Sequence, residues 1–176
     1  MDLGACALVR KYAPQIARCT GEKPLADVAC GSGRNAIVLA RLGCKVICLD
    51  KDFSNMLPEV RQFPTLLSLH LLDLGADSWP FGDSSLGGII NVHFLLPKLL
   101  PLFARSISSS GYLLLETVPG HGGNYLQLPQ EGELKSALEG CFDLELYRER
   151  KVGPPNSKSV TVKMIGKRKR REAQPA

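Results

Sequence analysis

A short apolar run followed at once by closely spaced glycines constrains the fold of this chain more than any other feature. Residues 25–29 (LADVA) are typical of a buried strand, and Gly31 and Gly33 then require a tight turn. Residues 34–42 follow with the apolar spacing of a packed helix, which Gly43 ends. A strand, a glycine turn and a helix in this order are typical of the first unit of a parallel, helix-covered sheet.

Strands and helices alternate along most of the chain. Further strands are predicted at residues 45–49, 65–71, 86–92 and 111–116, and further helices at residues 53–63, 95–106 and 131–138. Two final extended runs, residues 142–150 and 158–165, are joined by a loop too short for a helical crossover and should form an antiparallel hairpin. We therefore expect a three-layer, doubly wound α/β fold, whose mostly parallel seven-stranded sheet ends in an antiparallel hairpin.

The chain divides into one domain and two flanking segments. Its 176 residues suit a single domain, which we place at residues 25–166. Residues 1–24 should hold a short helix at residues 3–11, interrupted by Pro14 because proline cannot donate to the helical ladder. Residues 167–176 are polar and are expected to form a disordered basic tail.

Composition excludes several broad classes of protein. The hydrophobic fraction is 44%, and no apolar run approaches the roughly 18 residues of a membrane span. Residues 1–11 contain no signal-peptide core, so we expect a cytoplasmic protein. The six cysteines form no metal-type C-x-x-C pair, which favours reduced thiols and no metal site, with structural zinc as the alternative.

The formal charge of +5 is concentrated near the C-terminus. Residues 167–172 carry five positive charges and one negative charge, a net of +4, which leaves +1 for the other 170 residues. Residues 167–171 (KRKRR) form a solvated tail, a nuclear localisation signal or a contact to RNA phosphates. The run has no interleaved aromatic residues for base stacking, which disfavours a nucleic-acid partner.

The glycine turn predicts a site for a ligand that contains adenosine. Glycine lets a ligand approach the backbone, and the helix N-terminus offers unpaired N–H groups. Asp50 ends the next strand, 17 residues after Gly33, where a carboxylate can accept hydrogen bonds from both ribose hydroxyls. Residues 31–36 (GSGRNA) also satisfy the dinucleotide fingerprint G-x-G-x-x-G/A, so a dinucleotide and S-adenosylmethionine both remain open on this evidence.

The segment LADVACGSGRNA, residues 25–36, resembles the first motif of class I S-adenosylmethionine-dependent methyltransferases, in which an acidic residue precedes G-x-G-x-G. This chain has Ala29 where the first glycine of that motif is usual. Residues 31–35 (GSGRN), 122–126 (GGNYL) and 131–134 (EGEL) resemble the small tellurite-resistance-type methyltransferases within this class. The resemblance favours the methyl donor over a dinucleotide and agrees with a terminal antiparallel hairpin.

The resemblance assigns roles to individual residues. It implies that Asp27 lies near the methionine amino group and that Gly31 and Gly33 pass beneath the cofactor. It also implies that Asp50 holds the ribose and that Asp73 lies beside the adenine. The alternatives are a turn or helix cap for the first two acids and an Asp-x-Gly turn for Asp73. The complete set of predicted cofactor-binding residues is Asp27, Ala29, Cys30, Gly31, Gly33, Asn35, Asp50, Lys51, Asp73, Leu74 and Asn91.

The residues after strands four and five are predicted to meet the methyl acceptor. His93 would accept a proton or orient the acceptor, or else only line the pocket or cap the next helix. Methyl transfer depends mainly on alignment, so a catalytic base can also be absent. Trp79 and Phe81 would either wall the adenine or pack in the core. The predicted substrate contacts are Phe94, Glu116, His121 and Tyr125, at the edge of the sheet where ligands bind in open α/β folds.

Together these features predict an S-adenosylmethionine-dependent methyltransferase that acts on a small molecule. Residues 91–94 (NVHF) differ from the N-P-P-Y type that methylates amino groups of nucleic-acid bases, which disfavours an RNA substrate. An RNA or protein methyltransferase remains an alternative, as does a non-catalytic, methyltransferase-like interaction module with a shortened lid in residues 1–24. An NAD-dependent oxidoreductase is disfavoured by the terminal hairpin.

Overall fold

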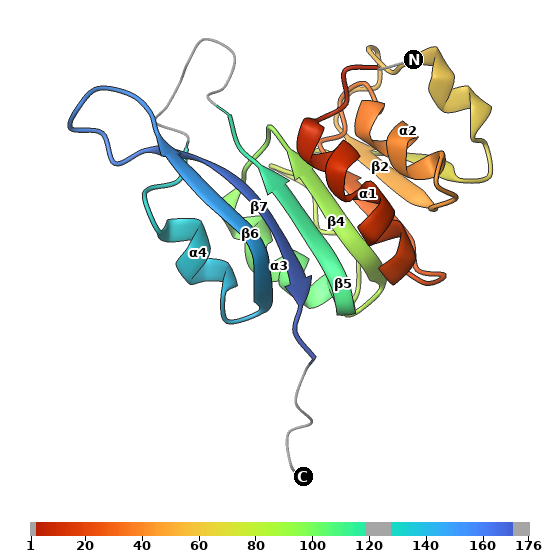
Figure 1. The fold of residues 1–176 in the computed structure, drawn as a ribbon. Helices are drawn as coiled ribbons and strands as arrows, with labels where there is room; N and C mark the ends of the chain where they lie inside the picture. Colours follow the sequence, from red (N-terminus) through yellow and green to blue (C-terminus); the bar gives the residue numbers. More distant parts are fainter. Residues whose placement is uncertain (1–2, 119–127, 171–176) are drawn as a thin grey trace.

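A computed structural model describes residues 3–118 and 128–170 (Figure 1). Its centre is a seven-stranded sheet in the order β3-β2-β1-β4-β5-β7-β6. Strands β1 to β5 are parallel, and β7 runs antiparallel between β5 and β6. The predicted sheet with its antiparallel hairpin is confirmed. The strands are β1 (Leu25–Val28), β2 (Val46–Asp50), β3 (Leu67–Leu71), β4 (Leu86–Val92), β5 (Ile107–Glu116), β6 (Phe142–Lys151) and β7 (Val160–Arg168).

Helices cover both faces of the sheet and complete the predicted three layers. They are α1 (Ala7–Cys19), α2 (Arg34–Ala40), α3 (Leu100–Ser106) and α4 (Glu133–Leu138), with short 3-10 helices η1 (Pro58–Gln62) and η2 (Pro97–Leu99). The first two lie on one face and α3 and α4 lie on the other (Figure 1). Among the described residues, no helix has the length and apolarity that a membrane crossing requires.

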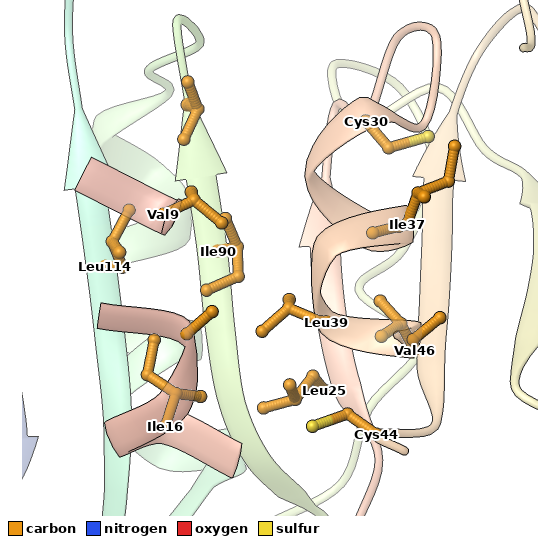
Figure 2. Packing of buried hydrophobic residues seen from close by; sticks show 14 of the residues in the cluster. Val9, Ile16, Leu25, Cys30, Ile37, Leu39, Cys44, Val46, Ile90 and Leu114 are labelled. Atoms are coloured by element: carbon orange, nitrogen blue, oxygen red, sulfur yellow. The ribbon is translucent and has the colours of Figure 1, made fainter. Parts of the chain in front are cut away.

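The core beneath α1 and α2 fixes the direction of the glycine turn. Figure 2 shows Ile16 of α1 and Leu39 of α2 in one cluster with Leu25 of β1 and Ile90 of β4. All four side chains are fully buried, and each such burial stabilises the fold by about 1.5–3 kcal/mol. Because α2 is held against the sheet in this way, its N-terminus stays at the carboxyl ends of the parallel strands.

Helix α1 continues through Pro14, so the predicted interruption at this residue is wrong. The Pro14 ring is exposed on the outer side of the helix. The inner side buries an apolar row against the sheet, and this packing outweighs the one helical hydrogen bond that proline cannot donate. The buried row consists of Leu8, Val9, Ala13 and Ile16.

The helix predicted over residues 53–63 does not form, and only η1 is helical there. The Asp52 carboxylate accepts hydrogen bonds from the backbone N–H and the hydroxyl of Ser54, both at 2.8 Å, which turns the chain before a helix can begin. The Leu57 N–H then donates to the Ser32 carbonyl oxygen at 3.0 Å. This loop therefore supports the glycine turn instead of forming a separate helix.

Strand β7 extends two residues beyond the predicted domain boundary at residue 166. The Arg168 guanidinium donates from Nε to the Ala104 carbonyl and from Nη1 to the Cys141 carbonyl, both at 2.8 Å. It also lies 5.7 Å from the centre of the Phe142 ring. The expectation of a tail from residue 167 onward is therefore wrong for Lys167 and Arg168, which are ordered parts of the sheet.

Candidate functional site

The turn between β1 and α2 contains three residues with a left-handed backbone. The angle φ is 54° at Ala29, 54° at Gly31 and 76° at Gly33. A Cβ atom at Gly31 would meet open space, whereas one at Gly33 would lie 2.6 Å from Sδ of Met56 and 3.0 Å from Cγ2 of Val60. Gly31 therefore leaves its side of the turn open to a ligand. Packing against η1 already requires glycine at position 33, which the motif alone did not reveal.

Ala29 and Cys30 enter the turn with their side chains in different environments. The positive φ of Ala29 accounts for the glycine that is usual there, since alanine in this conformation costs about 1–2 kcal/mol. Ala29 lines a cavity described below. Cys30 is buried, and hydrogen bonding to Cys48 together with burial raises the pKa of its thiol. Cys30 is thus a neutral core thiol.

Asp50 ends β2 directly beside the glycine turn, as predicted. Its Oδ2 accepts a hydrogen bond from the Gly31 N–H at 2.7 Å, and its Oδ1 accepts one from the Asp52 N–H at 3.2 Å. Each carboxylate oxygen has two lone pairs, so both can accept further hydrogen bonds from a ligand. The carboxylate is held in place by the turn and remains able to bind hydroxyl groups.

Asp27 is a buried carboxyl group with one unpaired oxygen. The residue is 1% exposed, and its Oδ2 has no hydrogen-bond partner. Burial raises the pKa of Asp27 to about 7, with a further rise from the charge of Asp50, although a hydrogen bond from the Ala36 N–H and the charge of Arg34 oppose the change. Because an unpaired buried carboxylate is costly, this position is suited to a bound cation.

A cavity of about 270 Å³ opens at the carboxyl ends of β1 and β2, beside the ends of β3 and β4. In α/β sheets of this kind, ligands bind where the chain passes to opposite faces, here between β1 and β4. The walls are mainly apolar, with carboxylates at the rim. The lining residues are Ala29, Asp50, Lys51, Leu72, Asp73, Leu74, Gly75, Phe94 and Leu96.

The cavity brings together five of the predicted cofactor-binding residues, namely Ala29, Asp50, Lys51, Asp73 and Leu74, and it also takes Phe94 from the predicted substrate set. Asp73 forms the Asp-x-Gly turn as well, because its Oδ1 accepts a hydrogen bond from the Gly75 N–H at 2.8 Å. Leu72, Gly75 and Leu96 also line the cavity, and none of the three was predicted as a site residue.

Trp79 and Phe81 pack in the core, which agrees with the second of their two predicted roles. Their ring centres are 5.1 Å apart, and Trp79 lies 5.2 Å from the ring of Phe103 in α3. The Trp79 indole N–H donates to the Ser106 hydroxyl at 2.8 Å. Neither ring lines the cavity described above.

Asn35 and Asn91 bind other parts of the protein. The Asn35 Oδ1 accepts a hydrogen bond from the Cys6 N–H at 2.9 Å, which ties the segment before α1 to the first turn of α2. The Asn91 amide donates to the Val28 carbonyl at 3.3 Å and joins β4 to β1. Both asparagines are buried, and their hydrogen bonds hold α2 and the ends of β1 and β4 in place.

A second group of side chains gathers around Glu116 at the end of β5. The Oε1 of Glu116 lies 3.7 Å from Nε2 of His93 and 3.1 Å from Nζ of Lys163, and its Oε2 accepts a hydrogen bond from the Cys6 thiol at 3.1 Å. Burial, followed by the contact with Glu116, raises the pKa of Cys6. His93 has a φ of 63°, a strained conformation that occurs more often at functional sites. Glu116 is therefore at the centre of the cluster.

Cys6 and Lys163 were not predicted to belong to this cluster, because no motif surrounds them and Cys6 is 110 residues away from Glu116 in sequence. The predicted substrate residues His121 and Tyr125 lie outside the described residues. Within residues 3–118 and 128–170, no group of three or more His, Cys, Asp or Glu side chains is arranged to hold a metal ion.

Comparisons with known proteins connect this geometry with one fold. No family model and no curated protein sequence matches the chain. TehB from Haemophilus influenzae matches its structure with a TM-score of 0.64 and 19% identity, over 90% of this chain and 62% of that protein. The chain has the class I methyltransferase fold.

Two further structures with the class I methyltransferase fold show how widely the acceptors vary. The 1,6-didemethyltoxoflavin-N1-methyltransferase of Burkholderia thailandensis, solved with S-adenosylhomocysteine, has a TM-score of 0.63 and 14% identity over 95% of this chain and 80% of that protein. The tRNA (m1A58) methyltransferase TrmI of Aquifex aeolicus has a TM-score of 0.61 and 12% identity over 93% of this chain and 69% of that protein. The fold predicted from the first motif is confirmed, and the similarity shows the fold alone.

Proposed function

We propose that this chain binds S-adenosylmethionine at the carboxyl ends of β1, β2 and β4 and transfers its methyl group to a small molecule. The main observation behind this proposal is that Oδ2 of buried Asp27 has no hydrogen-bond partner. The α-ammonium group of the cofactor's methionine part would pair with this buried carboxylate and offset the cost of burying its charge. A dinucleotide has no such group, so Asp27 favours the methyl donor.

The other residues of the site fit the remaining parts of the same ligand. The fixed carboxylate of Asp50 has lone pairs for both ribose hydroxyls. The cavity beside it offers Leu74 and Phe94 as apolar contacts for a flat base, with Asp73 at the rim. The N–H of Gly31 is already used by Asp50, so the open side of Gly31 serves close approach and not hydrogen bonding.

When bound, the cofactor supplies an electrophilic methyl group on a sulfonium. The acceptor atom would form a bond to this methyl as the carbon–sulfur bond breaks, and the electron pair of that bond stays on sulfur. Glu116 and His93 lie at the adjoining strand ends, where either can take the proton that the acceptor loses. The Lys163 ammonium group, 3.1 Å from Glu116, offsets the charge of this buried carboxylate. The rest of the rate enhancement would come from alignment.

A small acceptor is favoured over RNA by two observations. Arg168, one of the five basic residues in the C-terminal run, is bound to backbone carbonyls and is not available to phosphates. The Asn91 amide, which would have to face a nucleic-acid base, instead donates to the Val28 carbonyl. Geranyl diphosphate methyltransferase, an enzyme named for a small molecule, is among the similar structures, with 13% identity over 90% of this chain.

Calorimetric titration with S-adenosylhomocysteine, with NAD as the comparison ligand, tests the proposal. The wild-type protein should bind the first with micromolar affinity and should not bind NAD. Asp50→Ala should weaken binding by about 1.5–3 kcal/mol through the loss of charged hydrogen bonds. Asp143→Ala, which removes an exposed carboxylate of β6 at the other end of the sheet, is the matched control and should bind normally.

Unchanged affinity of the Asp50→Ala protein would refute the ribose assignment. Tight binding of NAD in place of S-adenosylhomocysteine would refute the methyltransferase proposal as a whole. Cofactor binding without methyl transfer to any of a panel of small nucleophiles would favour the non-catalytic interaction module.

A further inference from the structure

The β6–β7 hairpin carries a group of cationic side chains next to Glu116. Arg148 of β6 is paired with Lys163 of β7, and Arg150 is paired with Thr161. Lys163 is in turn paired with Glu116 of β5. Since side chains alternate between the two faces of a strand, all five project from one face, the same face that carries α1. They form a continuous polar surface that extends away from the proposed methyl-transfer site.

This surface lines a large groove. Helix α1 covers β4 and β5, and within the described residues no helix covers this face of β6 and β7 (Figure 1). The groove has a volume of about 880 Å³, toward the upper end of the roughly 300–1,000 Å³ typical of small-molecule sites. Its lining includes Glu116, Thr117, Arg148, Arg150, Thr161 and Lys163.

Two of the cations in the groove have no anionic partner. Lys151 pairs with Glu131 at 2.9 Å and Lys163 pairs with Glu116 at 3.1 Å, but no acidic side chain of the described residues pairs with Arg148 or Arg150. Residues 119–127 (PGHGGNYLQ), which follow β5, contain no aspartate or glutamate. Cations placed opposite each other on neighbouring strands destabilise a sheet, so this arrangement has a cost that a bound anion would offset.

Glu149, which also borders the groove, does not neutralise these arginines. Its Oε1 accepts hydrogen bonds from the Gly132 N–H at 2.9 Å and from the Tyr147 hydroxyl. Tyr147 packs in the core on the opposite face of the sheet, beneath α4. The carboxylate of Glu149 is therefore directed away from Arg148 and Arg150.

The cationic surface is local and does not continue as a track along the hairpin. Toward the other end of the same strands, Lys169 lies 3.9 Å from the Asp143 carboxylate and Glu145 accepts a hydrogen bond from the Tyr112 hydroxyl at 3.0 Å. Arg168 is bound to backbone carbonyls. A polynucleotide needs a row of cations, whereas this groove offers a single cluster, which suits one anionic group.

We infer that this groove binds the methyl acceptor through an oxyanion group, a phosphate or a carboxylate, held by Arg148 and Arg150 with the ammonium group of Lys163 beside them. Guanidinium groups bind both oxyanions through paired hydrogen bonds. The backbone of Arg148 is two strands from that of Glu116, or roughly 10 Å, a separation that a small acceptor can span. The inference rests on the proposed function, because it names the substrate class of that site.

Nuclear magnetic resonance titration of the backbone amides tests the anion site without needing the natural acceptor. Inorganic phosphate and malonate are added separately to the full chain at constant ionic strength, with sodium chloride as the reference. Saturable shifts are expected at residues 148–151 and 160–163, and the anion with the lower Kd identifies the oxyanion. The double substitution Arg148→Gln and Arg150→Gln should weaken this binding at least tenfold. Arg61→Gln, which removes an exposed arginine of η1, should leave it unchanged.

Shifts no larger than those with sodium chloride, or equal shifts in the double variant, would overturn the inference. Preferential binding of a single-stranded RNA oligonucleotide, with shifts that extend over residues 167–170, would overturn it in favour of a nucleic-acid acceptor. Titration of the same proteins with S-adenosylhomocysteine separates the two proposals. Normal cofactor binding with no anion binding refutes only the substrate class, whereas anion binding without cofactor binding refutes the proposed function.

Discussion

Replacing Asp27 with asparagine should stabilise the ligand-free protein and abolish cofactor binding. Burial raises the pKa of Asp27 from 3.8 to about 7. A carboxyl group whose pKa is higher in the folded than in the unfolded protein favours folding while it is protonated. That advantage is lost as the pH rises from the unfolded pKa through the folded pKa. Above pH 7 the wild-type protein therefore holds a buried carboxylate at a cost that an amide would not have.

The pKa values give the size of this effect. A tenfold change in a protonation constant is worth about 1.4 kcal/mol, so the rise from 3.8 to about 7 corresponds to roughly 4 kcal/mol at pH 8.5. The asparagine N–H group that takes the place of the unpaired Oδ2 would cost about 1–3 kcal/mol of this gain. Asp27→Asn should thus be more stable by about 1–3 kcal/mol at pH 8.5, and this difference should fall by about 2–3 kcal/mol by pH 5.

Urea-induced unfolding of both proteins at pH 8.5, 7 and 5 measures the difference, and calorimetry with S-adenosylhomocysteine measures binding. Comparing the two proteins at each pH cancels the titration of every other group. A difference that does not depend on pH would refute the raised pKa. An Asp27→Asn protein that still binds the ligand with wild-type affinity would refute the pairing with its ammonium group.

Three further predictions concern Asp27, the glycine turn and Arg168. The affinity for S-adenosylhomocysteine, followed by calorimetry, should fall about tenfold from pH 8 to pH 6, because Asp27, with a pKa of about 7, must be ionised to bind the ammonium; a constant affinity would contradict this. In urea unfolding, Gly33→Ala should cost about 2–3 kcal/mol and Gly31→Ala about 1 kcal/mol, since only the first brings a Cβ against Met56; equal losses would refute the packing role of Gly33. Arg168→Ala should destabilise the protein by about 1–3 kcal/mol in the same assay, whereas a change within 0.5 kcal/mol would indicate a solvated tail residue.

The sheet could be predicted from the sequence because its signals are local. Apolar strands, a glycine turn and a short final connection each occupy a few consecutive residues, and together they define the order of layers. The predictions at Pro14 and at residues 53–63 also relied on local signals, but contacts with other parts of the protein determine the structure at both places. Packing against the sheet holds α1 together through its proline, and the hydrogen bonds of Asp52 and Leu57 prevent the second helix.

The candidate site was predictable where a motif determines it and not elsewhere. Asp27 and Asp50 stand at strand ends beside the glycine turn, so their positions followed from the sequence. Cys6 and Lys163 meet at Glu116 only because three distant segments converge on one edge of the sheet. The unpaired charge of Arg148 could not be predicted either, because positive and negative side chains nearly cancel in the residues outside 167–172.

The measurement that tests the account most directly is a titration of the labelled protein with S-adenosylhomocysteine, followed through its backbone amide resonances. Binding of S-adenosylmethionine at this edge of the sheet predicts saturable shifts at Gly31, Lys51 and Leu74, around the glycine turn and the cavity, and none with NAD. Shifts at other parts of the chain, or no shifts at a ligand concentration of several millimolar, would contradict the claim that this edge of the sheet binds S-adenosylmethionine.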